Sequence, residues 1–221
     1  MKLGDEENAM LAGEAGPAVK WAIEHQLQVG RMFDAEDMVQ VSQAHMMADP
    51  ESLGEAGVSF TETLAADGAR VCIPMITDPR GVDLSCYAPI GQSEDMANLE
   101  RRFVAACQEM GIMMTNTCIN YQTIMPPVFG DHVAYGDTGV VIYSNSVCGA
   151  RSNFEGGPSA LAAALTPPTP PYPSPLPLHR QPPPRHPLTP PPQASMQWGP
   201  SAATTPPIAR TSSPAPPLER T

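Results

Sequence analysis

The distribution of proline divides this chain into a part that can fold and a part for which no fold is predicted. Only eight of the 28 prolines lie within residues 1–166, and the other 20 lie in residues 167–221. Proline fixes φ and lacks a backbone N–H, so a segment this rich in proline forms neither a helix interior nor a central strand. We therefore predict one folded part, residues 1–166, followed by a proline-rich, low-complexity tail, residues 167–221.

The charge of the folded part narrows the classes of partner. The tail holds four arginines and one glutamate, so it contributes +3 to the net charge of −11 and leaves −14 on residues 1–166. A surface this acidic repels phosphate backbones and anionic lipids. We therefore expect no nucleic acid and no membrane among the partners. No apolar run approaches the roughly 18 residues of a membrane span, and no basic segment followed by an apolar one stands at the start, so we expect neither a membrane span nor a signal peptide.

The cysteines indicate the compartment. All five lie in the folded part at irregular spacing, without a CxxC pair: Cys72, Cys86, Cys107, Cys118 and Cys148. This pattern argues against a disulfide scaffold and favours a reducing, cytoplasmic location.

Hydrophobic periodicity predicts an α/β fold with a mostly parallel sheet flanked by helices. The clearest helix is capped by Ser93, carries acids in its first turn and ends at Gly111. Asp5 is a plausible N-cap of the first helix, and a further helix starts near Pro158. The remaining expected helices cover residues 17–29, 53–67 and 131–135, and the expected strands cover residues 37–46, 70–75, 112–114 and 139–143.

Polar residues gather where these strands are expected to end. They form three clusters, at residues 42–45, 115–121 and 145–153. In parallel sheets ligands bind at the carboxyl ends of strands, and a following helix N-terminus suits a carboxylate or phosphate. We therefore predict substrate-binding roles for a set of residues on and after the third cluster, although a solvated loop would give a similar pattern: Asn145, Ser146, Arg151, Asn153, Glu155, Gly156, Gly157 and Ser159.

Three side chains in these clusters could carry chemistry. Cys118 could bind a metal or attack a substrate, although a lone cysteine is more often a small buried hydrophobe. His45, with Ser42 beside it, is the predicted catalytic position, while a structural histidine is about equally consistent. Arg151 could clamp a carboxylate or simply form a salt bridge in its loop. No Walker A, GxGxxG or GxSxG motif is present.

Several motifs, in the same order, resemble the large catalytic subunit of aconitase X over residues 1–166. They are MKLGDEENAMLAGEAGPAVKWAIE, SQAHMMADPESLGEAGVSF, DPRGVDL, TNTCINYQTIMPPVFGDHVAYGDTGVVIYSNS and GARSNFEGGPSALAAALT. The resemblance implies a hydro-lyase that uses an iron–sulfur cluster or iron and is closed by a small swivel subunit or domain. It implies a small hydroxy-acid substrate, cis-3-hydroxy-L-proline first and mevalonate 5-phosphate as the alternative.

The resemblance assigns a role to one cysteine. Cys118 matches the cysteine of the family segment that is implied to bind the cluster. The chain departs from relatives at Asn116, where some have another cysteine, and at Ile119 and Asn120, where a Thr-Pro pair is usual. Other cluster ligands are implied to lie in the second half of the family sequence.

That second half does not follow residue 166. The tail keeps Thr169, Pro170 and Tyr172 of the usual continuation but has prolines at its glycine and arginine positions. We interpret the tail as frame-shifted coding sequence and expect the chain as written to be an inactive fragment. The alternative is a non-catalytic interaction protein whose tail recruits partners that bind polyproline.

Overall fold

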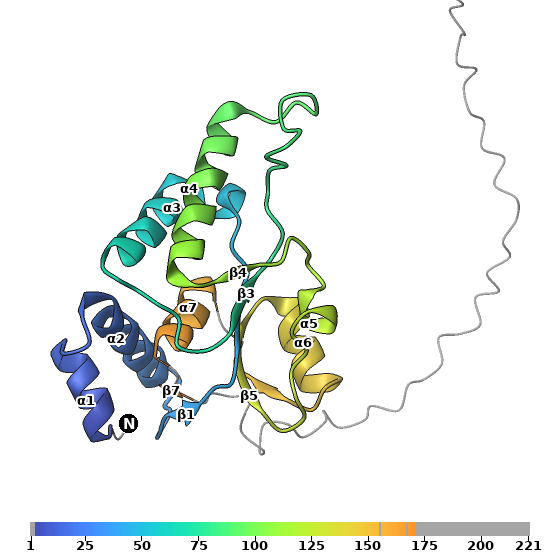
Figure 1. Cartoon of the computed structure of the whole chain (residues 1–221). Helices are drawn as coiled ribbons and strands as arrows, with labels where there is room; N and C mark the ends of the chain where they lie inside the picture. The colour runs from blue at the N-terminus through green and yellow to red at the C-terminus, as the bar shows by residue number, and fades with distance from the viewer. Residues whose placement is uncertain (1–2, 155, 167, 171–221) are drawn as a thin grey trace, which may run out of the picture. The chain divides into compact units, whose positions relative to one another are not determined.

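A five-stranded parallel sheet lies at the centre of the fold (Figure 1). The computed structural model describes residues 3–154, 156–166 and 168–170. The strands run in the order β4-β3-β2-β5-β6, and each neighbouring pair is parallel. Their bounds are β2 Ala44–Met46, β3 Met75–Thr77, β4 Met113–Met114, β5 His132–Gly136 and β6 Arg151–Ser152. The fold class is therefore the predicted one.

A second, smaller pairing joins the segment after α2 to the last described residues. β1 (Val39–Gln40) runs antiparallel to β7 (Pro168–Thr169). The fold thus includes two residues of the segment that was predicted to be tail. Residues 167 and 171–221 of that segment lie outside the described residues.

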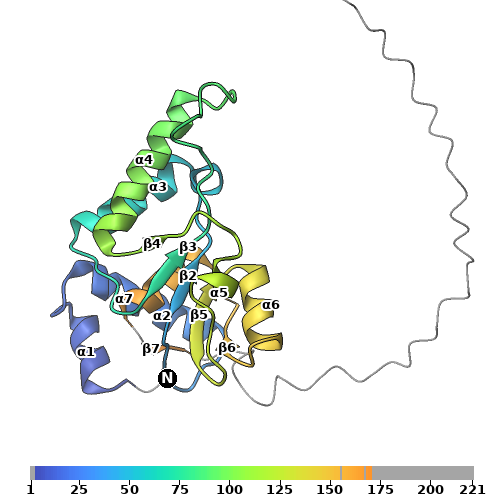
Figure 2. The ribbon, with the colours of Figure 1, turned by 45° about the vertical axis from the view of Figure 1, so that its right-hand side comes forward.

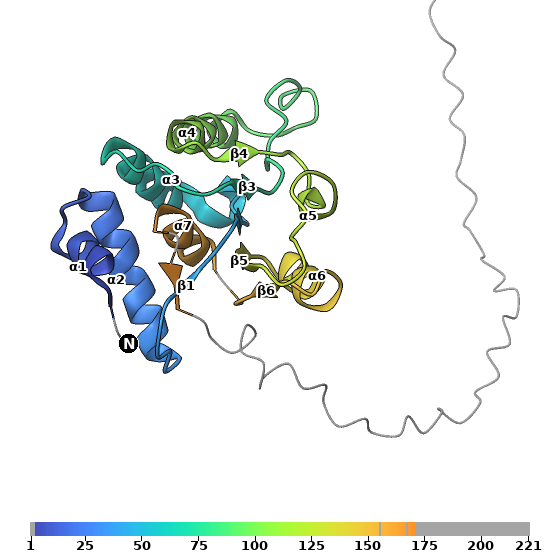
Figure 3. The same ribbon diagram turned by 60° about the horizontal axis from the view of Figure 1, so that its bottom comes forward.

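Seven helices of the described residues surround the sheet (Figures 1 and 3). Helix α7 packs against β2 and β5 and also against α2, whereas α3 pairs with α4 and α6 lies beside β5 and β6. None of these helices is both long and apolar enough to cross a membrane. Their bounds are α1 Asp5–Ala12, α2 Pro17–Met32, α3 Pro50–Ala66, α4 Glu94–Met110, α5 Asn120–Thr123, α6 Thr138–Ser146 and α7 Gly157–Leu165.

Helix α4 forms for the local reasons that its sequence indicates. The Ser93 hydroxyl accepts a hydrogen bond from the N–H of Met96 at 3.2 Å, which satisfies one free donor of the first turn. Gly111 ends the helix in the left-handed conformation at φ 85°, which costs glycine little. Phe103, Cys107 and other residues on one face are buried against α3 and the sheet.

Two elements have the opposite type from the one predicted. Residues 139–143, expected as a strand, lie in helix α6, and residues 131–135, expected as a helix, form most of β5. The Asp137 carboxylate caps α6 by accepting the N–H groups of Gly139 and Val140 at 2.9 and 3.4 Å. That cap and the packing of the helix outweigh the modest helix penalty of its β-branched residues.

Smaller corrections concern the first half of the chain. The expected strand 37–46 is two strands, β1 and β2, and the expected strand 70–75 begins only at Met75. The first helix is capped by Gly4 rather than Asp5, with the Gly4 N–H donating to the Glu7 carboxylate at 2.7 Å. The helices expected at 17–29 and 53–67 and the strand at 112–114 are present with slightly different bounds.

Candidate functional site

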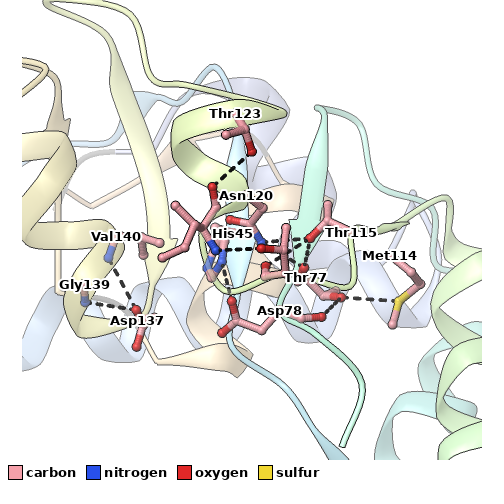
Figure 4. A network of polar contacts seen from close by, with 12 residues as sticks. His45, Thr77, Asp78, Met114, Thr115, Asn120, Thr123, Asp137, Gly139 and Val140 are labelled. Atoms are coloured by element: carbon pink, nitrogen blue, oxygen red, sulfur yellow. Dashed lines mark hydrogen bonds and ion pairs between the residues drawn. The ribbon is translucent and has the colours of Figure 1, made fainter. Parts of the chain in front are cut away.

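The carboxyl ends of β2, β3, β4 and β5 meet at one edge of the sheet and present polar side chains there (Figures 2 and 4). Asp78 follows β3, Thr115 follows β4 and Asp137 follows β5. Because all these strands run parallel, residues that are distant in sequence come together at this edge. The three side chains therefore form the frame of a site.

His45 and Asp78 form the pair at the centre of this edge. His45 Nε2 lies 3.1 Å from Asp78 Oδ1, and the imidazole is fully buried while the carboxylate keeps 14% of its surface exposed. The second ring nitrogen, Nδ1, is buried without a hydrogen-bond partner among the described residues. His45 therefore reaches the surface only through Asp78, and the carboxylate is the member of the pair that a ligand can touch.

A set of hydrogen bonds fixes the neighbouring β3 and β4 ends. Thr115 Oγ1 donates to the carbonyl of Thr77 at 2.6 Å. Asn120 Nδ2 donates to the same carbonyl at 2.9 Å and to Thr115 Oγ1 at 3.0 Å. Asn120 Oδ1 is buried and lacks a partner among the described residues. Unsatisfied buried polar atoms are rare in folded proteins and often mark functional sites.

Cys118 stands on the loop between β4 and α5, exposed to solvent. Partial burial raises the pKa of its thiol, and the negative charges of Asp78 and Asp137 raise that pKa further. Both carboxylates therefore act on the thiol through space. The structure brings Cys118 to the same edge as the His45–Asp78 pair, as the sequence predicted for two of its candidates.

The start of helix α7 approaches this edge from the other side. Gly156 is its N-cap, and Gly157 lies so close to β2 that a Cβ there would stand 3.1 Å from the carbonyl oxygen of Met47. Gly136 is equally confined, because a Cβ would lie 3.1 Å from the carbonyl oxygen of His45. These glycines allow α7 to pack directly against the sheet.

Most of the predicted substrate-binding residues do not reach the site. Asn145 donates to the carbonyls of Val141 and Ser152 at 2.9 and 3.0 Å, so it joins α6 to β6. Asn153 is buried and donates to the Pro170 carbonyl at 2.8 Å. Ser159 faces α2, where its hydroxyl lies 2.8 Å from His25 Nε2. These three contacts hold the fold together.

The other predicted residues lie elsewhere. Arg151 begins β6 and Ser42 precedes β2, so both lie at the amino ends of the strands, opposite to the edge that holds Asp78. The Ser42 hydroxyl donates to the Asp131 carboxylate at 2.9 Å. Ser146 is the exposed last residue of α6. Glu155 lies outside the described residues.

Comparison with known proteins identifies the family. The family model for the first domain of aconitase X matches residues 1–174. The chain belongs to the aconitase X family.

Relatives of this chain are named as dehydratases. The chain is 40% identical over 167 residues to the phosphomevalonate dehydratase large subunit of Methanothermobacter thermautotrophicus, covering 75% of this chain and 42% of the relative. It is 30% identical over 164 residues to the cis-3-hydroxy-L-proline dehydratase of Pseudomonas aeruginosa, covering 72% of this chain and 27% of the relative. The chain thus spans less than half the length of these aconitase X relatives.

A solved aconitase X structure has the same fold. The holo-form of Thermococcus kodakaraensis aconitase X superposes with a TM-score of 0.75 at 32% identity, covering 82% of this chain and 45% of that one. The match supports the parallel sheet and flanking helices described above.

The aconitase X resemblance implies iron, and the site has only part of what iron needs. The Cys118 thiol and the carboxylates of Asp78 and Asp137 are donors that iron accepts. However, no three His, Cys, Asp or Glu side chains of the described residues come close enough to hold one metal ion. These residues therefore do not form a complete iron site.

Asp78 and Asp137 are the site residues that the sequence interpretation missed. Each directly follows the last residue of a strand, Asp78 in the segment ITDP after β3 and Asp137 in the segment GDTG after β5. The strand before Asp78 was placed too early, and the strand before Asp137 was taken as a helix. Cys118 was selected because it lies in a polar segment that follows a strand. With the strands correctly placed, the same criterion would also have selected these two aspartates.

Proposed function

We propose that the chain is the N-terminal part of the catalytic subunit of a dehydratase, a hydro-lyase that removes water from a small hydroxy acid. The observation that carries the proposal is the partly exposed Asp78 carboxylate at the carboxyl edge of the sheet, which lies 3.1 Å from buried His45 and whose charge acts on the Cys118 thiol. The aconitase X family supplies the reaction class, since relatives are named dehydratases.

Loss of water from such an acid requires two bonds to break. The carbon next to the carboxylate loses a proton, the electron pair forms a carbon–carbon double bond, and the hydroxyl leaves from the next carbon to give water. We assign proton removal to Asp78, because its carboxylate is the part of the pair that reaches the surface. His45 is fully buried, so it would orient Asp78 as a positioning residue rather than touch the substrate.

The identities favour a substrate of the phosphomevalonate type. Identity is 40% to the phosphomevalonate dehydratase relative of Methanothermobacter and 30% to the cis-3-hydroxy-L-proline dehydratase of Pseudomonas. The motif resemblance gave the opposite order, with cis-3-hydroxy-L-proline first. We therefore place mevalonate 5-phosphate first and keep cis-3-hydroxy-L-proline as the second candidate.

The cofactor and the partner belong to the same proposal. Cys118 would be the ligand that this chain contributes to an iron or iron–sulfur centre, and the other ligands would come from the part of the family sequence that the match does not cover. A small subunit would complete the enzyme, because relatives are named large subunits. All five cysteines are free, which supports a reducing, cytoplasmic location.

A chimaera tests the proposal directly. Residues 1–166 replace the matching part of the Methanothermobacter large subunit, and the product is assayed with its small subunit on mevalonate 5-phosphate and on cis-3-hydroxy-L-proline. We expect loss of water from mevalonate 5-phosphate. The Asp78→Asn variant should lower kcat by about 10²–10⁴-fold, the usual contribution of a positioned base.

The matched control is Asp67→Asn, at the exposed C-terminal end of α3. It should leave kcat unchanged, and far-UV circular dichroism should be the same for both variants. If the chimaera converts neither substrate while the parent enzyme is active, the residues of this chain do not support dehydration. The interpretation as a non-catalytic interaction protein would then be favoured.

A further inference from the structure

A hollow adjoins the site on the side of β3 and β4. It has a volume of about 350 Å³ and is lined by six residues, Pro79, Arg80, Val82, Asp83, Leu84 and Asn116. Pro79 and Arg80 directly follow Asp78, and Asn116 directly follows Thr115 of the hydrogen-bonded frame. The hollow therefore lies beside the two segments that carry Asp78 and Thr115.

Arg80 is the cation in the wall of this hollow. It is exposed, and it makes no ion pair within 4 Å in the part of the chain that the structure describes. The other arginines near α3 and α4 are all paired: Arg70 with Glu109, Arg101 with Glu94, and Arg102 with Glu55 and Glu62. Arg80 lies two residues after Asp78, so this unpaired guanidinium stands beside the site.

The two carboxylates on which the charge of Arg80 acts already accept hydrogen bonds from backbone N–H groups. The positive charge of Arg80 acts through space on the carboxylates of Asp83 and Glu100. Asp83 accepts the Ser85 N–H at 2.9 Å, and Glu100 accepts the Gly81 N–H at 3.0 Å. The guanidinium donors of Arg80 consequently remain available to a ligand in the hollow.

The turn that carries Arg80 is held from both sides. Fully buried Glu100 binds the Gly81 N–H from helix α4. Gln92 donates to the Gly81 carbonyl at 2.9 Å and accepts the Asp83 N–H at 3.1 Å. The backbone around Arg80 is therefore already ordered, so binding would cost little backbone entropy.

We propose that Arg80 binds the phosphate group of a phosphorylated hydroxy acid whose reacting carbon lies at Asp78. The inference rests on the proposed dehydratase function and assigns the residue that recognises the phosphate of its substrate. The planar guanidinium fork matches phosphate oxygens through two parallel hydrogen bonds. The Cα atoms of Asp78 and Arg80 lie at most about 7 Å apart, so one elongated substrate could contact both side chains. The same subsite would discriminate against hydroxyproline, which carries no phosphate.

A binding measurement on the full 221-residue chain tests the subsite without turnover. Inorganic phosphate is titrated calorimetrically into the wild type, Arg80→Ala, Arg80→Lys and Arg70→Ala, with acetate as a second ligand. We expect saturable phosphate binding that weakens by about 10- to 100-fold in Arg80→Ala, as expected for loss of charge-assisted hydrogen bonds. Arg80→Lys should be intermediate, and Arg70→Ala, a paired arginine next to Glu109, should match the wild type.

Three results would overturn the inference. They are the absence of saturable phosphate binding to the wild type, equal affinity of wild type and Arg80→Ala, or acetate binding that is as tight as phosphate binding and equally dependent on Arg80. Because Arg80 is exposed, circular dichroism of its variants should be unchanged, so weakened binding would not reflect unfolding.

Kinetics of the chimaera separate this inference from the proposed function. Arg80→Ala should raise KM for mevalonate 5-phosphate by about tenfold or more, with a smaller change in kcat, because the phosphate does not react. An unchanged KM in an active chimaera would refute the phosphate subsite and leave the dehydratase function standing. Phosphate binding that depends on Arg80 together with an inactive chimaera would refute the function alone.

Discussion

The described residues form two hydrophobic clusters. The clusters differ in size and in how clearly the local sequence indicates the helices and strands that build them. The larger cluster joins α2, α3, α4 and α7 to β2 and β3, with Phe103, Met110 and Leu161 fully or almost fully buried. The smaller one consists of five buried residues that belong to α5, β5 and α6: Tyr121, Val133, Tyr135, Val140 and Val141. The candidate site lies between them: Asp78 and Arg80 are on the segment that joins β3 to α4 in the larger cluster, whereas Cys118 directly precedes α5 and Asp137 directly precedes α6 in the smaller one.

The comparison shows that the site depends on both clusters. The ring of His45, in β2, lies 5.8 Å from the ring of Tyr135 in the smaller cluster. The smaller side also carries several exposed apolar side chains, among them Ile124, Phe129, Ile142 and Val147. We expect substitutions in the larger cluster to affect global stability and those on the smaller side to affect the site more than the fold.

The largest expected effect is that of Phe103→Ala in the larger cluster. Phe103 is 1% exposed between α4 and the sheet, so its removal leaves a cavity that the packed helices cannot fill. The free energy of unfolding should fall by about 3–5 kcal/mol, and urea denaturation followed by circular dichroism measures it. Val140→Ala in the smaller cluster should lower it by only about 1.5 kcal/mol, for two lost methyl groups. Equal losses would remove the distinction between the clusters.

The second prediction concerns the pH dependence of the larger cluster. Burial raises the pKa of Cys107 to about 12, with a smaller contribution from the charge of Glu100. An unfolded cysteine titrates near 8.5, so above that pH the unfolded state loses a proton that the folded state keeps. The resulting stability is present below pH ~8.5 and is lost as pH rises, by about 2–3 kcal/mol at pH 10.5.

The variant Cys107→Ala isolates this contribution. Its free energy of unfolding should decline less steeply than that of the wild type between pH 8.5 and 10.5, when both are measured by urea denaturation. Cys72→Ala, at an exposed position, is the control and should keep the steep wild-type decline. Parallel curves for wild type and Cys107→Ala would show that other groups govern alkaline unfolding.

A matched pair of helix caps, one beside each cluster, allows the stability contributions of the two sides to be compared. Each cap is expected to contribute about 1 kcal/mol. Asp49 caps α3 by accepting the Ser52 N–H at 2.9 Å, and Asp137 caps α6 by accepting the Gly139 N–H at 2.9 Å. Replacing either by alanine should lower the free energy of unfolding by about 0.5–2 kcal/mol. A loss confined to Asp49→Ala would indicate that α6 contributes little to the stability of the whole domain.

The two sides also differ in how well their elements could be predicted. Helix α4 carries complete local signals, a Ser93 cap, acids in the first turn and Gly111 at its end, and it was predicted correctly. Helix α6 contains the run GVVIY, whose β-branched residues favour a strand by local preference. Its helical state is set by the Asp137 cap and by packing against β5 and β6, and packing is not visible in a short sequence window.

The same reason limited the prediction of the site. His45 and Cys118 were predicted because each lies in or after a strand that was placed nearly correctly, and their roles stay predictions. Asp78 and Asp137 were missed because the strands before them were shifted or assigned as a helix. Asn145, Asn153 and Ser159 have the composition of a binding loop, but they satisfy backbone and side-chain groups that burial would otherwise leave unpaired.

The smallest expected effect tests whether the two sides meet at Cys118. Asp78 from the larger side and Asp137 from the smaller side both raise the pKa of this thiol, after partial burial, which contributes most. Removing either negative charge favours the thiolate, so Asp78→Asn and Asp137→Asn should each lower that pKa. The rate of alkylation by iodoacetamide, followed at the Cys118 peptide by mass spectrometry across pH 6–10, reports it. The control Asp49→Asn changes a cap whose charge does not act on the thiol and should leave the curve in place. A shift with only one of the two variants would assign Cys118 to a single side, and the site would then belong to one cluster instead of joining both.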